Sequence, residues 1–137
     1  MGWINWDHAD LELSDFVGRL AEFRREHECL RQSRFLHGAI KPQNGRPDVE
    51  WTDFNGAPLQ WRNPGLSNIC LTLRRSADTA STGTSDDMVF VVFNRGENDA
   101  EVVLPKAPEG CHWVRAIDTA AVDNFPCCET GLGLMPI

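Results

Sequence analysis

Apolar residues recur every three or four positions between residues 13 and 30, and this spacing predicts one long amphipathic helix. Asp10 or Ser14 can cap its start, because a short side-chain oxygen accepts a hydrogen bond from an unpaired backbone N–H there. No later stretch has a helical period, so the chain is predicted to be one leading helix followed by a β region. The apolar stripe consists of Leu13, Phe16, Val17, Leu20, Phe23 and Leu30.

Short alternating or apolar runs separated by turn residues predict antiparallel strands downstream of the helix. The alternation over 67–74 predicts that Ile69, Leu71 and Leu73 face inward, with Cys70 on the outer side. The apolar run 88–93 predicts the most buried strand, and 101–104 its hairpin partner. Further strands are predicted over 48–54 and 111–118, and two more are predicted to begin at 35–36 and near 132–137. The stretch 76–87 is predicted to be a mobile loop.

These elements together predict a mainly β fold, an antiparallel β-sandwich domain preceded by one long amphipathic helix. The predicted division is 1–36 for the N-terminal segment with the helix, and 37–137 for the sandwich domain.

Charge and composition change this picture only by exclusion. The chain has 137 residues, with 13 Lys plus Arg against 20 Asp plus Glu, for a net charge of −7. This balance argues against nucleic acid or an anionic membrane as a partner, because both require a concentrated basic surface. No apolar run approaches the ~20 residues that span a bilayer. No secretory signal is recognised and the five cysteines are an odd number, so a reduced, cytoplasmic setting is predicted.

Candidate chemistry is sparse. The sequence has no nucleophile elbow, phosphate-binding loop or dinucleotide fingerprint, and no carboxylate that the pattern marks as a buried acid. We therefore predict no catalytic residue, no metal ligand and no cofactor. His27 and Cys29 form only half of a possible metal site. A redox or metal protein that uses Cys111, His112, Cys127 and Cys128 is a distant alternative.

The chain has five tryptophans and no tyrosine. An indole face can pack against the C–H face of a pyranose, which makes Trp51, Trp61 and Trp113 candidate glucan-binding residues. Tryptophans are also ordinary core residues, and this is the alternative interpretation for each of the three.

The order of several short motifs resembles the C-terminal end of bacterial glycogen debranching enzymes of the isoamylase type, in the α-amylase superfamily of glycoside hydrolases. The resemblance covers roughly 3–119. Its motifs are WINWD at 3–7, LAEFRREH at 20–27, LRQSRFLHG at 30–38, DVEW at 48–51, Gly56, Trp61, the apolar strand that ends at 93–94, and the stretch 113–119.

The resemblance implies that the helix is the last helix of a (β/α)₈ barrel and that the rest is a C-terminal β-sandwich. The parent enzyme would cleave α-1,6 branch linkages of glycogen or limit dextrin, with two carboxylates that lie upstream of residue 1. This chain would then be a non-catalytic and inactive domain with the barrel of the same parent chain and an α-glucan as partners. A carbohydrate-binding module is the alternative. A helix that has lost its barrel would expose its stripe, which predicts a homodimer or a helix folded against the sheet.

Overall fold

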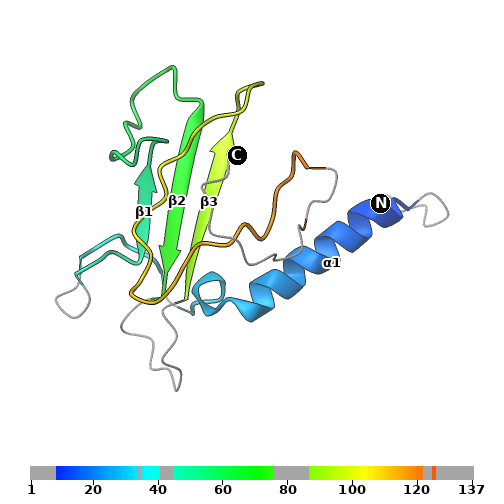
Figure 1. Cartoon of the computed structure of the whole chain (residues 1–137). Coiled ribbons are helices and arrows are strands. Elements are labelled where there is room, and N and C mark those ends of the chain that lie inside the picture. Colours follow the sequence, from blue (N-terminus) through cyan, green and yellow to red (C-terminus); the bar gives the residue numbers. More distant parts are fainter. Residues whose placement is uncertain (1–8, 34, 41–44, 76–86, 122–124, 126–137) are drawn as a thin grey trace, which may run out of the picture.

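The computed structural model describes residues 9–33, 35–40, 45–75, 87–121 and 125. The described elements are one α-helix, one short 3₁₀ turn and three strands (Figure 1). Their bounds are α1 Leu11–Glu26, η2 Glu28–Leu30, β1 Val49–Thr52, β2 Asn68–Arg74 and β3 Met88–Asn94.

The helix α1 starts at a side-chain cap. Asp10 has extended backbone angles, and its carboxylate accepts a hydrogen bond of 2.9 Å from the Leu13 N–H. Of the two predicted caps, Asp10 is therefore the one used. The helix ends at Glu26, earlier than predicted, because His27 is extended and the Cys29 N–H donates to a carboxylate of another segment.

The sheet is antiparallel with the strand order β1-β2-β3. In the row through its centre, Trp51 pairs with Leu71, and Leu71 pairs with Val91. The neighbouring row pairs Thr52 with Cys70 and Cys70 with Val92. Since side chains alternate along a strand, these two rows lie on opposite faces of the sheet.

The more deeply buried face of β2 is the one with Cys70, not the one predicted. Cys70 and Thr72 are fully buried, whereas Ile69, Leu71 and Leu73 are only half-buried, so the predicted inward face of this strand is wrong. The chain after β3 crosses the sheet (Figure 1), and it lies on the Cys70 face, because its Trp113 contacts Phe90, which pairs with Thr72. Covering segments, rather than the alternation of residue types, therefore decided which face became the core.

The predicted order of strand burial is also wrong. β3 lies at one edge of the described sheet, and its Phe93 is exposed, whereas β2 is central and carries Cys70 and Thr72, which are more deeply buried than Val89 of β3. A continuous apolar run shows that a strand can be buried on both faces, but it does not give the strand a central position.

Three predicted strands are wrong in the described part of the chain: those at 35–36, 101–104 and 111–118 have no strand geometry. The Val103 N–H donates to the Phe54 carbonyl, 2.8 Å away, so the chain after β3 reaches the end of β1 and does not return beside β3. The N–H groups of His37 and Gly38 are bound by a side-chain carboxylate and not by a neighbouring strand.

The turn predicted at Asn55 and Gly56 is confirmed. Gly56 has a φ of 80°, a conformation that suits glycine, and the Asp53 N–H donates to the Ala57 carbonyl at 2.8 Å. The loop over 76–86, the strand near 132–137, Trp3, Trp6, Cys127 and Cys128 lie outside the described residues.

The helix extends to one side of the sheet and does not lie on either of its faces (Figure 1). The predicted helix folded against the sheet is therefore wrong, and the homodimer stays a prediction. No residue of α1 is buried, and Leu13 and Val17 are exposed. Phe16 is half-covered, because the ring of Phe125 lies 5.5 Å from its ring.

Candidate functional site

Two of the three candidate tryptophans lie together. Trp51 lies on β1, and Trp61 lies between β1 and β2. The centroids of their rings are 5.4 Å apart, and the ring planes are inclined at 70°. Their exposed fractions are 38% and 60%, so both indoles reach solvent. We call this pair the tryptophan corner.

Trp113 lies elsewhere, is half-buried and contacts other parts of the chain. Its indole N–H donates to the Pro105 carbonyl at 2.7 Å, and its ring centroid is 5.9 Å from that of Phe90. Phe90 pairs with Thr72, so Trp113 covers the Cys70 face, opposite to Trp51. The structure therefore separates this candidate from the other two, and its glucan-binding role stays a prediction.

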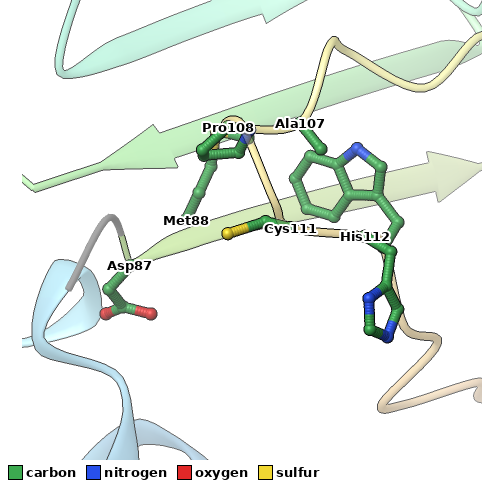
Figure 2. A pocket seen from close by; sticks show the side chains of 7 residues that line it. Asp87, Met88, Ala107, Pro108, Cys111 and His112 are labelled. Carbon is green, nitrogen blue, oxygen red and sulfur yellow. The ribbon is translucent and has the colours of Figure 1, made fainter.

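A shallow pocket of about 200 Å³ lies beside the start of β3, with Asp87 at one end and His112 at the other (Figure 2). Pockets that bind small molecules are commonly larger, roughly 300 to 1,000 Å³. The pocket is lined by Asp87, Met88, Ala107, Pro108, Cys111, His112 and Trp113. Asp87 is its only carboxylate, so the pocket has no acid–base pair for glycoside hydrolysis.

The Asp87 carboxylate joins the helix to the sheet, although the sequence places it at the end of a polar loop. One oxygen lies 2.7 Å from the Nδ1 of His27, and the other accepts the Cys29 N–H at 2.9 Å. We call His27, Cys29 and Asp87 the Asp87 junction. Burial by itself raises the pKa of Asp87, but the hydrogen bonds from His27 and from the N–H and thiol of Cys29 outweigh it and lower the pKa below its usual range.

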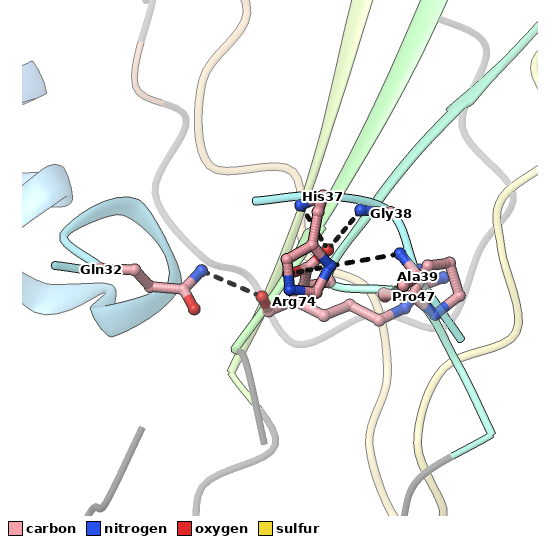
Figure 3. A network of polar contacts seen from close by, with 7 residues as sticks. Gln32, His37, Gly38, Ala39, Pro47 and Arg74 are labelled. Atoms are coloured by element: carbon pink, nitrogen blue, oxygen red, sulfur yellow. Dashed lines mark hydrogen bonds and ion pairs between the residues drawn. The ribbon is translucent and has the colours of Figure 1, made fainter. Parts of the chain in front are cut away.

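A second carboxylate organises the segment before β1. Asp48 is 5% exposed, and one of its oxygens accepts the N–H groups of Gly38 at 2.8 Å and His37 at 3.3 Å (Figure 3). Its other oxygen has no hydrogen bond and lies 3.7 Å from the Nδ1 of His37. The nearby Gln32 amide links the Cys29 and Arg74 carbonyls. We call Asp48, His37 and Gly38 the Asp48 network.

Sequence reasoning missed both buried acids. The available signals are position and neighbours: Asp48 and Asp87 each directly precede a strand, where a carboxylate can bind unpaired N–H groups of an adjoining segment. Both carboxylates bind backbone N–H groups of their own fold, and this arrangement indicates a structural role.

The described cysteines are free thiols, and two of them are buried. Burial, with the negative charge of Asp87, raises the pKa of Cys29 to about 12. Burial, with the charge of Asp53, raises the pKa of Cys70 to about 11. Because the thiolate is the reactive form, both thiols are chemically inert at neutral pH.

We expect one fast-reacting thiol among these three. In a chain with Cys127 and Cys128 changed to serine, Cys111 should react with Ellman's reagent at once, and Cys29 and Cys70 only after unfolding. The absorbance time course with and without denaturant measures this, and adding Cys111→Ser should remove the fast phase. Fast reaction of all three thiols in the folded chain would contradict the prediction.

Metal and membrane sites have no support in the described part of the chain. There, no group of three or more His, Cys, Asp or Glu side chains could hold a metal ion. The described helices are also too short or too polar to cross a bilayer.

Comparison with known proteins gives three informative relatives. The chain is 27% identical over 128 residues to an isoamylase of Flavobacterium sp., which covers 90% of this chain and 16% of that protein. It is 24% identical to isoamylase 2, chloroplastic, of Arabidopsis thaliana, over 80% of this chain and 12% of that protein. It is 37% identical to a glycogen debranching enzyme of Pectobacterium atrosepticum, over 43% of this chain and 8% of that protein. The chain thus spans less than a fifth of the length of these relatives. No family model and no solved structure matches it.

Proposed function

Since the chain is homologous to isoamylases over most of its length and to a glycogen debranching enzyme over 43% of it, we propose that it is the non-catalytic C-terminal part of a glycogen debranching enzyme. Its parent would hydrolyse the α-1,6 branch linkages of glycogen or limit dextrin in the cytoplasm. In this proposal, residues 1–36 belong with a catalytic barrel, and 37–137 form a sandwich domain beside it.

The partly exposed stripe of α1 carries the proposal. The helix presents Leu13 and Val17 to solvent, and none of its residues is buried, although its apolar residues follow one stripe. An amphipathic helix gains most of its stability from burying such a stripe. Its end is fixed to the sheet by the Asp87 junction, so it projects at a defined place. We infer that the stripe packs on the barrel of the parent and that the domain braces that barrel.

The chemistry of the described residues agrees with a bracing role. A retaining glycosidase needs two carboxylates roughly 5 Å apart on either side of the scissile bond. The two buried carboxylates, Asp48 and Asp87, instead bind backbone N–H groups. The isolated chain should therefore release no reducing sugar from glycogen limit dextrin, and release of glucan chains by a pure sample would overturn the proposal.

An isolated chain with this stripe uncovered is expected to self-associate. Light scattering after size exclusion should give a homodimer that Leu13→Glu with Val17→Glu converts to a monomer, because the charges cannot be buried between two helices. Both positions are already exposed, so the circular dichroism spectrum should not change. Glu22→Gln, at an exposed position of the same helix, is the matched control and should leave the dimer intact.

The same variants test bracing in an enzyme. A chimaera can be built in which this chain replaces the 128-residue segment that it matches in the Flavobacterium isoamylase. Leu13→Glu with Val17→Glu should lower the melting temperature of the chimaera, whereas Glu22→Gln should not. An unchanged melting temperature in the double variant would show that the stripe does not brace the barrel.

A further inference from the structure

We propose that the tryptophan corner is a binding surface for linear α-linked glucan chains. The identity of the sugar rests on the proposed function. The site itself rests on two indoles, Trp51 and Trp61, that lie 5.4 Å apart and remain 38% and 60% exposed. Large aromatic side chains usually bury most of their area, so an exposed pair in contact indicates a surface for an apolar partner.

The corner is held in place without being buried. The Leu59 N–H donates to the Trp51 carbonyl at 3.2 Å, and the Leu59 side chain is buried. After Trp61, the Asn63 side chain accepts the Gly65 N–H at 2.9 Å, which closes the turn. These contacts fix the backbone on both sides of the Trp61 indole. A ligand would therefore meet a preformed surface, which lowers the entropic cost of binding.

The chemistry around the rings suits a sugar. Gln60 and Arg62 flank Trp61 in the sequence and are exposed, so the two positions on either side of this indole offer an amide and a guanidinium group to solvent. A pyranose presents C–H groups on its faces and hydroxyl groups around its edge, and therefore needs both kinds of contact. A protein partner would need apolar contact over a larger area.

The angle between the rings favours one glucan class. Successive glucose units of an α-1,4 chain turn relative to one another, so their faces point in different directions. The units of a β-1,4 chain form a flat ribbon. Two indoles inclined at 70° match the curved chain and not the flat one. This angle, together with the proposed function, favours α-linked chains such as the outer branches of glycogen.

Titration of the full chain with maltoheptaose, followed by tryptophan fluorescence, tests the proposal. We expect saturable quenching in the millimolar range and at least about a tenfold weaker affinity in Trp61→Ala, because the more exposed ring is lost. Trp51→Phe, which keeps an aromatic ring on β1, should bind with intermediate affinity. Trp113→Phe is the matched control and should bind as the unmodified chain does, because Trp113 lies on the opposite face.

Three outcomes would overturn the proposal: a flat titration, equal binding of cellohexaose, or an unchanged affinity in Trp61→Ala. Loss of self-association in Trp61→Ala without any sugar binding would also overturn it, and would identify the corner as a contact between copies of this chain. These results are independent of α1. A flat titration leaves the bracing role intact, and failure of the Leu13 and Val17 variants leaves the glucan surface intact.

Discussion

Replacing Asp87 with alanine is expected to lower the free energy of unfolding by about 3 kcal/mol, the larger effect of the two buried acids. The side chain of Asp87 is 12% exposed, and its two oxygens bind the imidazole of His27 and the N–H of Cys29. Its removal leaves a buried backbone donor without a partner and separates the end of α1 from the start of β3. Urea unfolding followed by circular dichroism measures the change.

Asp15→Ala is the matched control for this variant. Asp15 is an exposed aspartate of α1 that pairs with Arg19 at 3.3 Å. Surface ion pairs contribute little, so the control should change the stability by less than about 0.5 kcal/mol. An Asp87→Ala chain as stable as the control would show that the junction does not stabilise the fold.

The contribution of Asp87 is also expected to depend on pH. Its folded-state pKa is lowered by the hydrogen bonds from His27 and Cys29, which outweigh the opposing effect of burial. A lowered folded-state pKa stabilises the protein fully above the usual aspartate range, roughly pH 4, and this stabilisation is lost as the pH falls through the lowered value. The stability difference between the unmodified chain and Asp87→Asn should therefore shrink as the pH falls below about pH 4. A difference that grows in acid would contradict the assignment.

Replacing Asp48 with alanine is expected to cost about 2 kcal/mol, because two N–H groups, of His37 and Gly38, lose a common acceptor. Asp48→Asn is the matched control. It keeps an oxygen where both N–H groups donate, and the other oxygen of Asp48 makes no hydrogen bond to lose. We expect the asparagine variant to be less than about 1 kcal/mol below the unmodified chain.

The two variants can be separated by hydrogen exchange as well as by urea unfolding. The amides of His37 and Gly38 should lose protection in Asp48→Ala and keep it in Asp48→Asn, whereas the amides of β2 should stay protected in both. Equal destabilisation by alanine and asparagine would show that the charge of Asp48, and not its acceptor oxygen, stabilises the segment.

The sequence by itself determined the local features of this protein. The apolar stripe, the cap at Asp10, the turn at Gly56 and three of the strands follow from periodicity and turn chemistry, which act between residues close in the chain. The family resemblance also came from the sequence, because the order of short motifs survives where each motif alone is weak.

The tertiary structure decided what depends on residues far apart in the chain. The chain after β3 covers the Cys70 face, although the alternation of β2 indicated the other face, because burial depends on which segment crosses the strand. Asp87 became a junction because the fold brings two distant parts of the chain together. The helix α1 ends 61 residues before Asp87 in the sequence, yet the Nδ1 of His27, the residue after α1, lies 2.7 Å from the Asp87 carboxylate. The three candidate tryptophans are equivalent in the sequence. Only the tertiary structure brought Trp51 and Trp61 together, through the pairing of β1 with β2 and the turn between them. It placed Trp113 against Phe90 instead. Such contacts are set by packing and not by the local sequence pattern.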